Sequence, residues 1–267
     1  MNSSSNYITQ DEWQNLTDTQ KKEICSLIRE ENTKKLPLQP INIPDTFYVK
    51  YGKRILDFVI GTSAFIVCIP INFVMAIITL IDVGHPIIFT QERIGKDGKP
   101  FNIMKFRNMT NETDEKGNIL PASQRVTKWG KFVRRTSLDE LLNFWCVARG
   151  NMSIIGPRPL PDLYMDRYSD FHVQRHKVRP GLDCPLHTKS LAGKSWEGRF
   201  DNDIWYAENI SFRTDLSMIL KLIHKVFSKK ERLEGALGRT GEFIGYFPDG
   251  TTIDSYCIPK RYLSMIS

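Results

Sequence analysis

Arg134-Arg135-Thr136-Ser137-Leu138-Asp139-Glu140 opens the stretch of sequence that decides the fold, and Gly156-Pro157-Arg158-Pro159 closes it. Between them, apolar residues recur at i, i+3, i+4 and i+7, one face of a helix: Leu138, Leu141, Leu142 and Trp145. Ser137 stands three residues before Glu140, as in a capping box, so the pattern predicts that this helix starts near Ser137.

Charged groups of both signs gather at this predicted helix start. Asp139 and Glu140 would lie in the first turn, beside free backbone N–H groups, with Arg134 and Arg135 just before them. Such a place can hold a phosphate and bind a divalent cation. A structural role is the alternative, because acidic residues in a first turn complement the helix dipole. The pair alone favours the structural role, so the rest of the chain has to decide.

Length and composition restrict the class of protein. The chain has 267 residues, 41% of them apolar, which is enough for one domain with extensions. A net charge of +7 favours an anionic partner such as nucleic acid, a membrane surface or a phosphorylated substrate. The five cysteines are scattered without a CxxC pair, which argues against structural zinc and disulfides and indicates a reducing compartment. The first fifty residues are polar, so no signal peptide is expected.

The two ends of the chain carry little recognisable chemistry. Residues 11–31 predict a helix with a narrow apolar face, interpreted as an accessory surface helix, and residues 36–44 predict an extended linker with three prolines. After residue 235 we find a turn at Pro248-Asp249-Gly250 and no recognisable site.

An uncharged run from Phe58 to Ile81 predicts a membrane helix. It has about 24 residues, or about 36 Å as a helix, against a hydrocarbon core of about 30 Å. Both flanks are basic, which one straight span cannot reconcile with the positive-inside rule. A re-entrant helix that bends at Pro70 and returns to the same face can. A long buried core helix is the alternative.

The remaining segments predict a small α+β domain. Ile87–Thr90 and Phe101–Arg107 suggest a β-hairpin around a turn at residues 95–98, with Lys105 and Arg107 either holding phosphate or solvated. The basic run Arg175–Arg179 reads as a solvated face when taken alone. Residues 212–227 form an amphipathic helix whose apolar side could lie on an anionic membrane or pack on a core.

A series of short motifs, in this order, resembles the bacterial sugar transferases, the monotopic polyprenyl-phosphate phosphoglycosyl transferases. The motifs cover about Tyr48 to Arg232 and are Lys53-Arg54-x-x-Asp57, Phe89-Thr90-Gln91-x-Arg93-x-Gly95, Phe101-x-Ile103-x-Lys105-Phe106-Arg107-x-Met109, Ser137-Leu138-Asp139-Glu140-Leu141, Gly150-x-Met152-Ser153-x-x-Gly156-Pro157-Arg158-Pro159, Arg175-His176-Lys177-Val178-Arg179-Pro180-Gly181, Ser195-Trp196 and Asp215-Leu216. Each motif is weak, but the ordered series is specific.

The resemblance implies a mostly helical α+β fold with a re-entrant membrane helix, amphipathic interface helices and a small β-hairpin. It divides the chain into an N-terminal extension (1–47), the membrane helix (48–82), a catalytic domain (83–232) and a C-terminal extension (233–267). It also implies a location on the cytoplasmic face of the bacterial inner membrane.

The resemblance further implies transfer of a phosphosugar from a UDP-sugar to polyprenyl (undecaprenyl) phosphate, which initiates membrane-linked glycan synthesis such as that of exopolysaccharide. Asp139 would attack phosphorus and form a phosphosugar-aspartyl intermediate, kept ionised by the helix N-terminus, and Glu140 would bind Mg²⁺. The remaining site positions are phosphate-binding (Lys105, Arg134 and Arg158) or supporting (Pro157, Pro159, Asp203 and Asp215).

Two departures from the family pattern keep a second function open. The chain has Ile69-Pro70 where the family commonly has Ser-Pro, and a family arginine falls on Leu191, with Lys189 and Lys194 as the nearby substitutes. A catalytically silent, membrane-anchored scaffold is therefore the alternative. A nucleic-acid binder would leave residues 58–81 unexplained, so no nucleic acid is expected as a partner. The oligomeric state stays open, with a homodimer among the options.

Overall fold

Over the residues that the structure describes, the chain folds mostly into helices, with three small two-stranded sheets. The computed structural model describes residues 6–32, 38–115, 117, 119–187, 195–228 and 241–266. The helices are α1 (Gln10–Asn15), α2 (Asp18–Asn32), α3 (Lys53–Val83), α4 (Ala122–Arg125), α5 (Lys128–Thr136), α6 (Asn143–Arg149), α7 (Trp196–Glu208) and α8 (Phe212–Phe227). The paired strands are β1 (Ile88–Ile94) with β2 (Pro100–Phe106), β3 (Ser153–Ile155) with β4 (Gly181–Asp183), and β5 (Phe243–Tyr246) with β6 (Thr252–Asp254).

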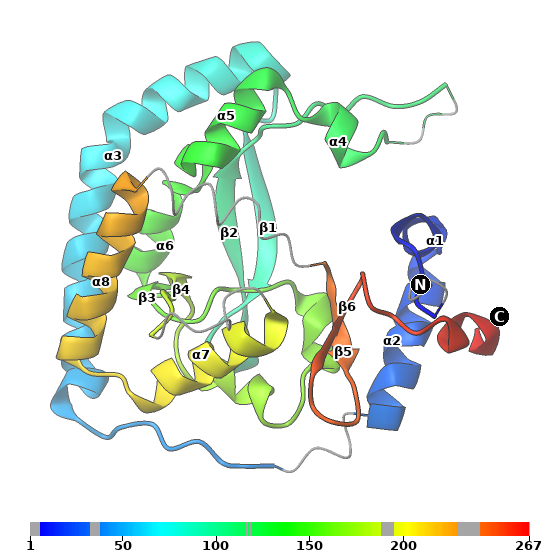
Figure 1. Ribbon diagram of the computed structural model, residues 1–267. Coiled ribbons are helices and arrows are strands. Elements are labelled where there is room, and N and C mark those ends of the chain that lie inside the picture. The colour runs from blue at the N-terminus through cyan, green and yellow to red at the C-terminus, as the bar shows by residue number, and fades with distance from the viewer. Residues whose placement is uncertain are drawn as a thin grey trace.

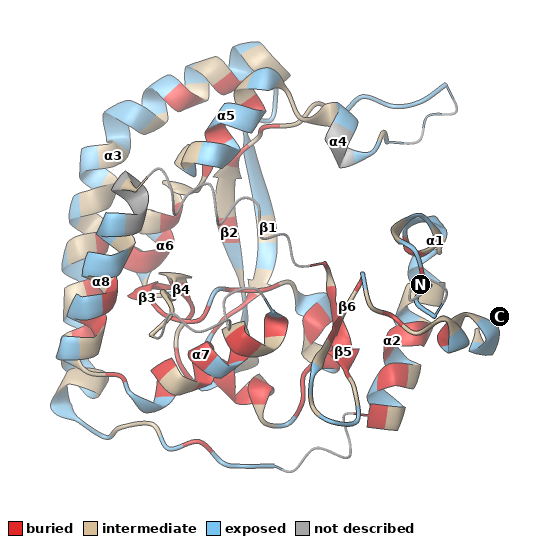
Figure 2. Cartoon of the chain, in the orientation of Figure 1, coloured by how far each residue is buried: buried red, intermediate tan, exposed pale blue. Residues whose placement is uncertain are grey.

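The longest helix, α3, runs along one side of the molecule and curves around it (Figure 1). It is continuous through Pro70. Among the described residues, only Tyr48–Val83 is a helix long and apolar enough to cross a membrane. Just 17% of its most apolar stretch is buried, which argues against the core helix of a soluble protein. Its outward side is largely exposed in Figure 2, and its exposed apolar side chains include Phe58, Val59, Ile66, Val67, Ile69, Phe73, Val74 and Ile81.

The inward side of α3 packs on α6 and β3. Gly61 lies so close to α6 that a Cβ there would come within 2.8 Å of Val147. Asp57 is buried and accepts hydrogen bonds from Ser153 Oγ (2.9 Å) and the Ile154 backbone N–H (3.0 Å). One face of the helix therefore packs on β3 and α6, and the opposite, apolar face is exposed.

The predicted β-hairpin is confirmed. Strands β1 and β2 pair antiparallel from Ile88↔Phe106 to Ile94↔Pro100, around a 3₁₀ turn at Lys96–Gly98. This register places Phe89 opposite Lys105 and Gln91 opposite Ile103 on one face of the hairpin, because alternate residues of a strand share a face.

The two predicted extensions pack against each other. The single helix predicted over residues 11–31 is two helices, α1 and α2, and α2 buries its narrow apolar face while its polar side stays largely exposed. Ile24 and Ile28 of α2 are fully buried in a cluster with Ile244 and Ile253 of the C-terminal hairpin. Both termini consequently lie on the same side of the molecule, away from α3 (Figure 1). A second cluster joins Phe243 and Tyr246 to Tyr168 and to Phe200 of α7.

Helix α8 has apolar residues on two sides. Met218 is buried and Ile219 and Leu222 pack on the main core, whereas a second stripe (Phe212, Leu216, Leu220 and Ile223) is 45–59% exposed. The helix therefore both packs on the core and leaves an apolar stripe uncovered.

Candidate active site

The stretch around Asp139 differs from the predicted helix. Ser137 adopts a left-handed conformation (φ 57°, ψ 23°) that ends α5, and no side-chain capping bond forms there. Leu138–Glu140 then makes a 3₁₀ turn, and α6 begins only at Asn143. The predicted capping box and single helix face are thus wrong, because the chain reverses at Ser137 and changes helix type. Leu138 and Leu142 pack beside Val133, whereas Trp145 lies against Phe65 of α3.

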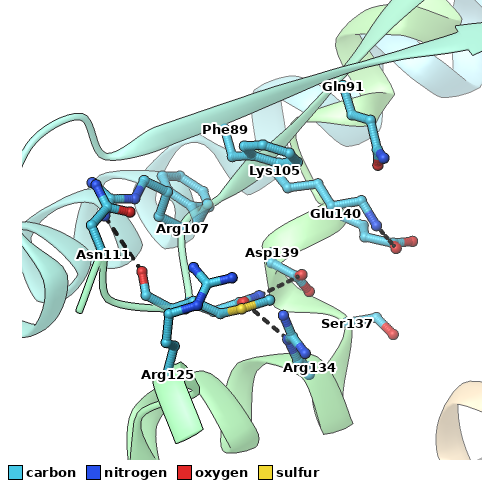
Figure 3. Close-up of a pocket in the computed structure, with 13 residues that line it drawn as sticks. Phe89, Gln91, Lys105, Arg107, Asn111, Arg125, Arg134, Ser137, Asp139 and Glu140 are labelled. Carbon is cyan, nitrogen blue, oxygen red and sulfur yellow. Dashed lines mark hydrogen bonds and ion pairs between the residues drawn. The ribbon is translucent and has the colours of Figure 1, made fainter. Parts of the chain in front are cut away.

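This reversal carries Asp139 and Glu140 into a cavity of about 550 Å³ between the hairpin and α5. Figure 3 shows the hairpin residues Phe89, Gln91 and Lys105 on one side of it and Arg134 on another. Arg107, Asn108, Arg125 and Ser137 also line the cavity. Four of the predicted site residues therefore meet here: Lys105, Arg134, Asp139 and Glu140.

Glu140 lies between two cations. Lys105 Nζ is 2.5 Å and Arg158 Nη2 is 3.2 Å from the same oxygen, Glu140 Oε1. Burial works against ionisation, but Arg158 and Lys105 together outweigh it and hold the pKa of this carboxyl below its usual value. Glu140 therefore stays charged while largely compensated.

Asp139 has a different environment. It is buried and accepts a hydrogen bond from Asn108 Nδ2 at 3.1 Å. Burial first and Glu140 second raise the pKa of Asp139, while Lys105 and Arg134 oppose the rise. The expected stabilisation of its charge by a helix N-terminus is wrong, since the helical segment here is a single 3₁₀ turn.

Arg158 and Pro159 lie beside the cavity. They line a small adjoining space of about 30 Å³, together with Lys105 and Glu140. The segment is held by a close backbone approach: Gly181 N–H donates to Pro157 O at 3.0 Å, and a Cβ on Gly181 would come within 2.1 Å of Gly156 N. Gly156 and Pro157 thus position Arg158 without entering the cavity.

Asp203 and Asp215 are not among the residues that line the cavity. Asp203 accepts from Arg175 Nη2 (2.6 Å) and Nε (2.9 Å), and Arg175 also donates to the backbone O of Arg158 (2.8 Å). Asp215 accepts from Lys53 Nζ (2.9 Å) and from the Tyr206 hydroxyl (2.6 Å). Both carboxylates form buried ion pairs, so Arg175 is not the solvated basic residue that its run suggested when taken alone. Lys189 and Lys194 lie outside the described residues.

The donor set suits Mg²⁺ with substrate phosphates. No group of three His, Cys, Asp or Glu side chains gathers within the described part of the chain, so protein ligands alone do not enclose a metal there. Mg²⁺ needs only one or two carboxylates when phosphate oxygens complete its shell. Asp139 and Glu140 are adjacent carboxylates in a cationic cavity, and both contacts of Glu140 with cations fall on one oxygen.

Sequence reasoning missed Asn108, Gln91 and Arg125 at this site. Asn108 occupies a position that the motif leaves open, so no local signal could have selected it. Gln91 belongs to a quoted motif, but only the hairpin register shows that it faces the cavity.

Known proteins resemble this chain over the same region. The sequence profile described as bacterial sugar transferase matches residues 48–229. An uncharacterized sugar transferase of Bacillus subtilis, EpsL, is 39% identical over 177 residues, which cover 65% of this chain and 86% of EpsL. UDP-glucose:undecaprenyl-phosphate glucose-1-phosphate transferase of Klebsiella pneumoniae is 36% identical over 190 residues, which cover 67% of this chain and 40% of that protein.

A third relative is UDP-N-acetylgalactosamine-undecaprenyl-phosphate N-acetylgalactosaminephosphotransferase of Aeromonas hydrophila. It is 30% identical over 189 residues, which cover 68% of this chain and 44% of that protein. The chain thus spans less than half the length of the Klebsiella and Aeromonas relatives. The profile match and the likeness to EpsL agree with the motif order and the geometry of the site: the chain belongs to the bacterial sugar transferase family.

Proposed function

We propose that this chain is a phosphoglycosyl transferase that moves a phosphosugar from a UDP-sugar to undecaprenyl phosphate. One observation carries the proposal: two adjacent carboxylates, Asp139 and Glu140, lie in a cavity lined by cationic side chains. Only Glu140 is paired at short range with cations. The names of the Klebsiella and Aeromonas relatives, which act on UDP-sugars and undecaprenyl phosphate, support this assignment.

The two environments suggest two roles. An oxygen of Asp139, whose charge is less compensated, attacks the phosphorus that bears the sugar. A new carboxylate–phosphorus bond forms and the bridging P–O–P bond breaks, so that UMP leaves with the bridging oxygen. A phosphate oxygen of undecaprenyl phosphate then attacks the same phosphorus, breaks the bond to Asp139 and restores the carboxylate. Splitting the transfer into two steps lets one site serve a soluble donor and a lipid acceptor in turn.

The cationic side chains bind and orient the phosphates. Lys105 and Arg158 keep Glu140 ionised, and Arg134 presents a planar guanidinium to the cavity. Glu140 is the residue that would hold Mg²⁺, which when bound neutralises charge on the diphosphate and improves the leaving group.

The exposed apolar surfaces suggest how the enzyme meets its lipid substrate. Tyr48, just before α3, packs edge-on against Phe212 at the start of α8, with ring centroids 5.8 Å apart, so the two helices that carry exposed apolar side chains begin close together. We propose that α3 enters the cytoplasmic leaflet of the bacterial inner membrane, bends at Pro70 and returns, with α8 at the interface. The active site would then lie at the level of the lipid phosphate.

UMP release tests the reaction. Detergent-solubilised protein is incubated with Mg²⁺, undecaprenyl phosphate and a panel of UDP-sugars. We expect release with at least one donor for the wild type and for Asp162→Asn, a substitution of an exposed aspartate, and none for Asp139→Asn. A phosphosugar adduct on Asp139 should be trapped when the acceptor is omitted. Folded, membrane-bound protein that releases UMP from no donor would contradict the enzyme and favour the silent scaffold.

A further inference from the structure

Asn108 links Asp139 to Arg134. It lies two residues after the end of β2 and is buried. Its Nδ2 donates to Asp139 Oδ2 at 3.1 Å, and its Oδ1 accepts from Arg134 Nε at 2.9 Å. An arginine can only donate and a carboxylate can only accept, so the two partners fix which way the amide points.

We propose that Asn108 is a positioning residue for the nucleophile. By holding Oδ2 of Asp139, the amide leaves Oδ1 as the oxygen that meets phosphorus. By accepting from Nε of Arg134, the same amide directs the remaining guanidinium N–H groups to the donor phosphates. This inference rests on the proposed function and extends it to a residue that no motif selects.

The choice of an amide has an electrostatic reason. Asp139 is buried, and a hydrogen bond donated to a buried carboxylate stabilises its charged form. A cation at the same place would also favour ionisation but would neutralise the attacking oxygen, as Lys105 and Arg158 do for Glu140. A neutral donor instead favours the ionised form while leaving the charge available for attack.

Three variants test this role. Asn108→Ala removes the amide, Asn108→Ser keeps a shorter donor, and Asn102→Ala is the matched control. Asn102 is exposed and lies on β2, opposite Glu92 and away from the cavity of Asp139. Thermal unfolding of each variant establishes that it folds.

The first measurement is the rate of UMP release as a function of UDP-sugar concentration, which separates kcat from KM. For Asn108→Ala we expect kcat to fall on the order of ten- to a hundredfold, the loss typical of one hydrogen bond to a charged group. We expect KM for the UDP-sugar to change much less, because the hydrogen bond to the attacking carboxylate is lost. Asn108→Ser should recover part of the loss of kcat, and Asn102→Ala should match the wild type. A folded Asn108→Ala protein with wild-type kcat would overturn the inference while leaving the proposed function intact.

The second measurement does not depend on activity. A double-mutant cycle compares the thermal unfolding of Asn108→Ala, of Asp139→Ala and of the protein with both changes. We expect the effects of the two single changes not to add, because the two side chains share a hydrogen bond. The same cycle with Asn102→Ala in place of Asn108→Ala should be additive. Additive effects of Asn108→Ala and Asp139→Ala would overturn the inference even if the wild type released no UMP. An inactive wild type would by itself contradict only the proposed function.

Discussion

At the scale of single residues, the two adjacent carboxylates of the site have different electrostatic environments. Glu140 is compensated by Lys105 and Arg158, whereas Asp139 is buried with a neutral amide as its hydrogen-bond donor. Burying a carboxylate without a close cation lowers the stability of the fold. Proteins keep such a destabilising group where the chemistry of the site requires its charge. Asp139 should therefore be a residue whose ionised form opposes folding.

This leads to a prediction about Asp139→Asn. The folded-state pKa of Asp139 lies above its usual value, so the folded protein binds the proton more tightly than the unfolded chain does. The stability of the wild type relative to the variant must then fall as the pH rises from the usual pKa to the raised one. We expect Asp139→Asn to unfold a few degrees higher than the wild type at neutral pH, with the difference narrowing toward about pH 4.

Calorimetry at several pH values measures this difference in Tm, with Asp162→Asn as the control. An Asp139→Asn protein that is less stable than the wild type at neutral pH would show that the carboxylate stabilises the fold. Loss of activity in Asp139→Asn could then no longer be assigned to the missing nucleophile alone.

At the scale of elements, the sequence predicted those helices and strands whose formation depends on local residue patterns. The hairpin followed from alternating apolar residues around glycines, and the long apolar run produced a helix with an exposed apolar side. The capping box failed because the decisive quantity is the positive φ of Ser137, which a serine–glutamate spacing does not specify. Pairings such as Arg175 with Asp203 join residues far apart in the chain, so neither partner could be recognised locally as buried.

The approach of α5 to the hairpin gives a second prediction. A Cβ on Gly130 would lie 2.1 Å from the backbone oxygen of Asn108, so alanine cannot be accommodated unless α5 moves. Alanine in place of a helical glycine normally stabilises by about 1 kcal/mol, which makes the expected sign here the reverse of the usual one. We expect Gly130→Ala to lower both the Tm and the rate of UMP release, because Arg134 on α5 would lose its position relative to Asn108.

Lys131→Ala is the matched control, since it places the same residue at an exposed position of the same helix. Circular dichroism follows unfolding of both variants, and UMP release follows the site. A Gly130→Ala protein with raised Tm and normal UMP release would contradict this prediction. It would mean that α5 can move away from Asn108 without loss of stability or activity.

At the scale of the whole molecule, the two ends of the chain form a unit on one side and the apolar helix α3 lies on the other (Figure 1). The family profile covers residues 48–229, so the paired extensions lie outside it. They are nevertheless joined to the catalytic part, since Tyr246 Oη lies 2.9 Å from His172 Nδ1 and Trp196 Nε1 donates to Gly241 O at 2.8 Å. Stability of the two ends should therefore depend on their shared core.

Ile244→Ala tests this dependence. Ile244 is fully buried against residues of α2, and truncating such a side chain typically costs roughly 2–5 kcal/mol. Because Ile244 shares one buried cluster with Ile24 and Ile28 of α2, the loss should appear first as local opening of the N-terminal helices. We expect trypsin to cleave after Lys22 much faster in Ile244→Ala than in the wild type, while KM for the UDP-sugar stays unchanged because Asp139 lies in a separate cavity. Ile119→Ala, the same truncation at a position that is 66% exposed, should cleave like the wild type. Equal cleavage of α2 in all three proteins would mean that the N-terminal helices do not need the C-terminal hairpin, and that the extensions are independent additions to the transferase.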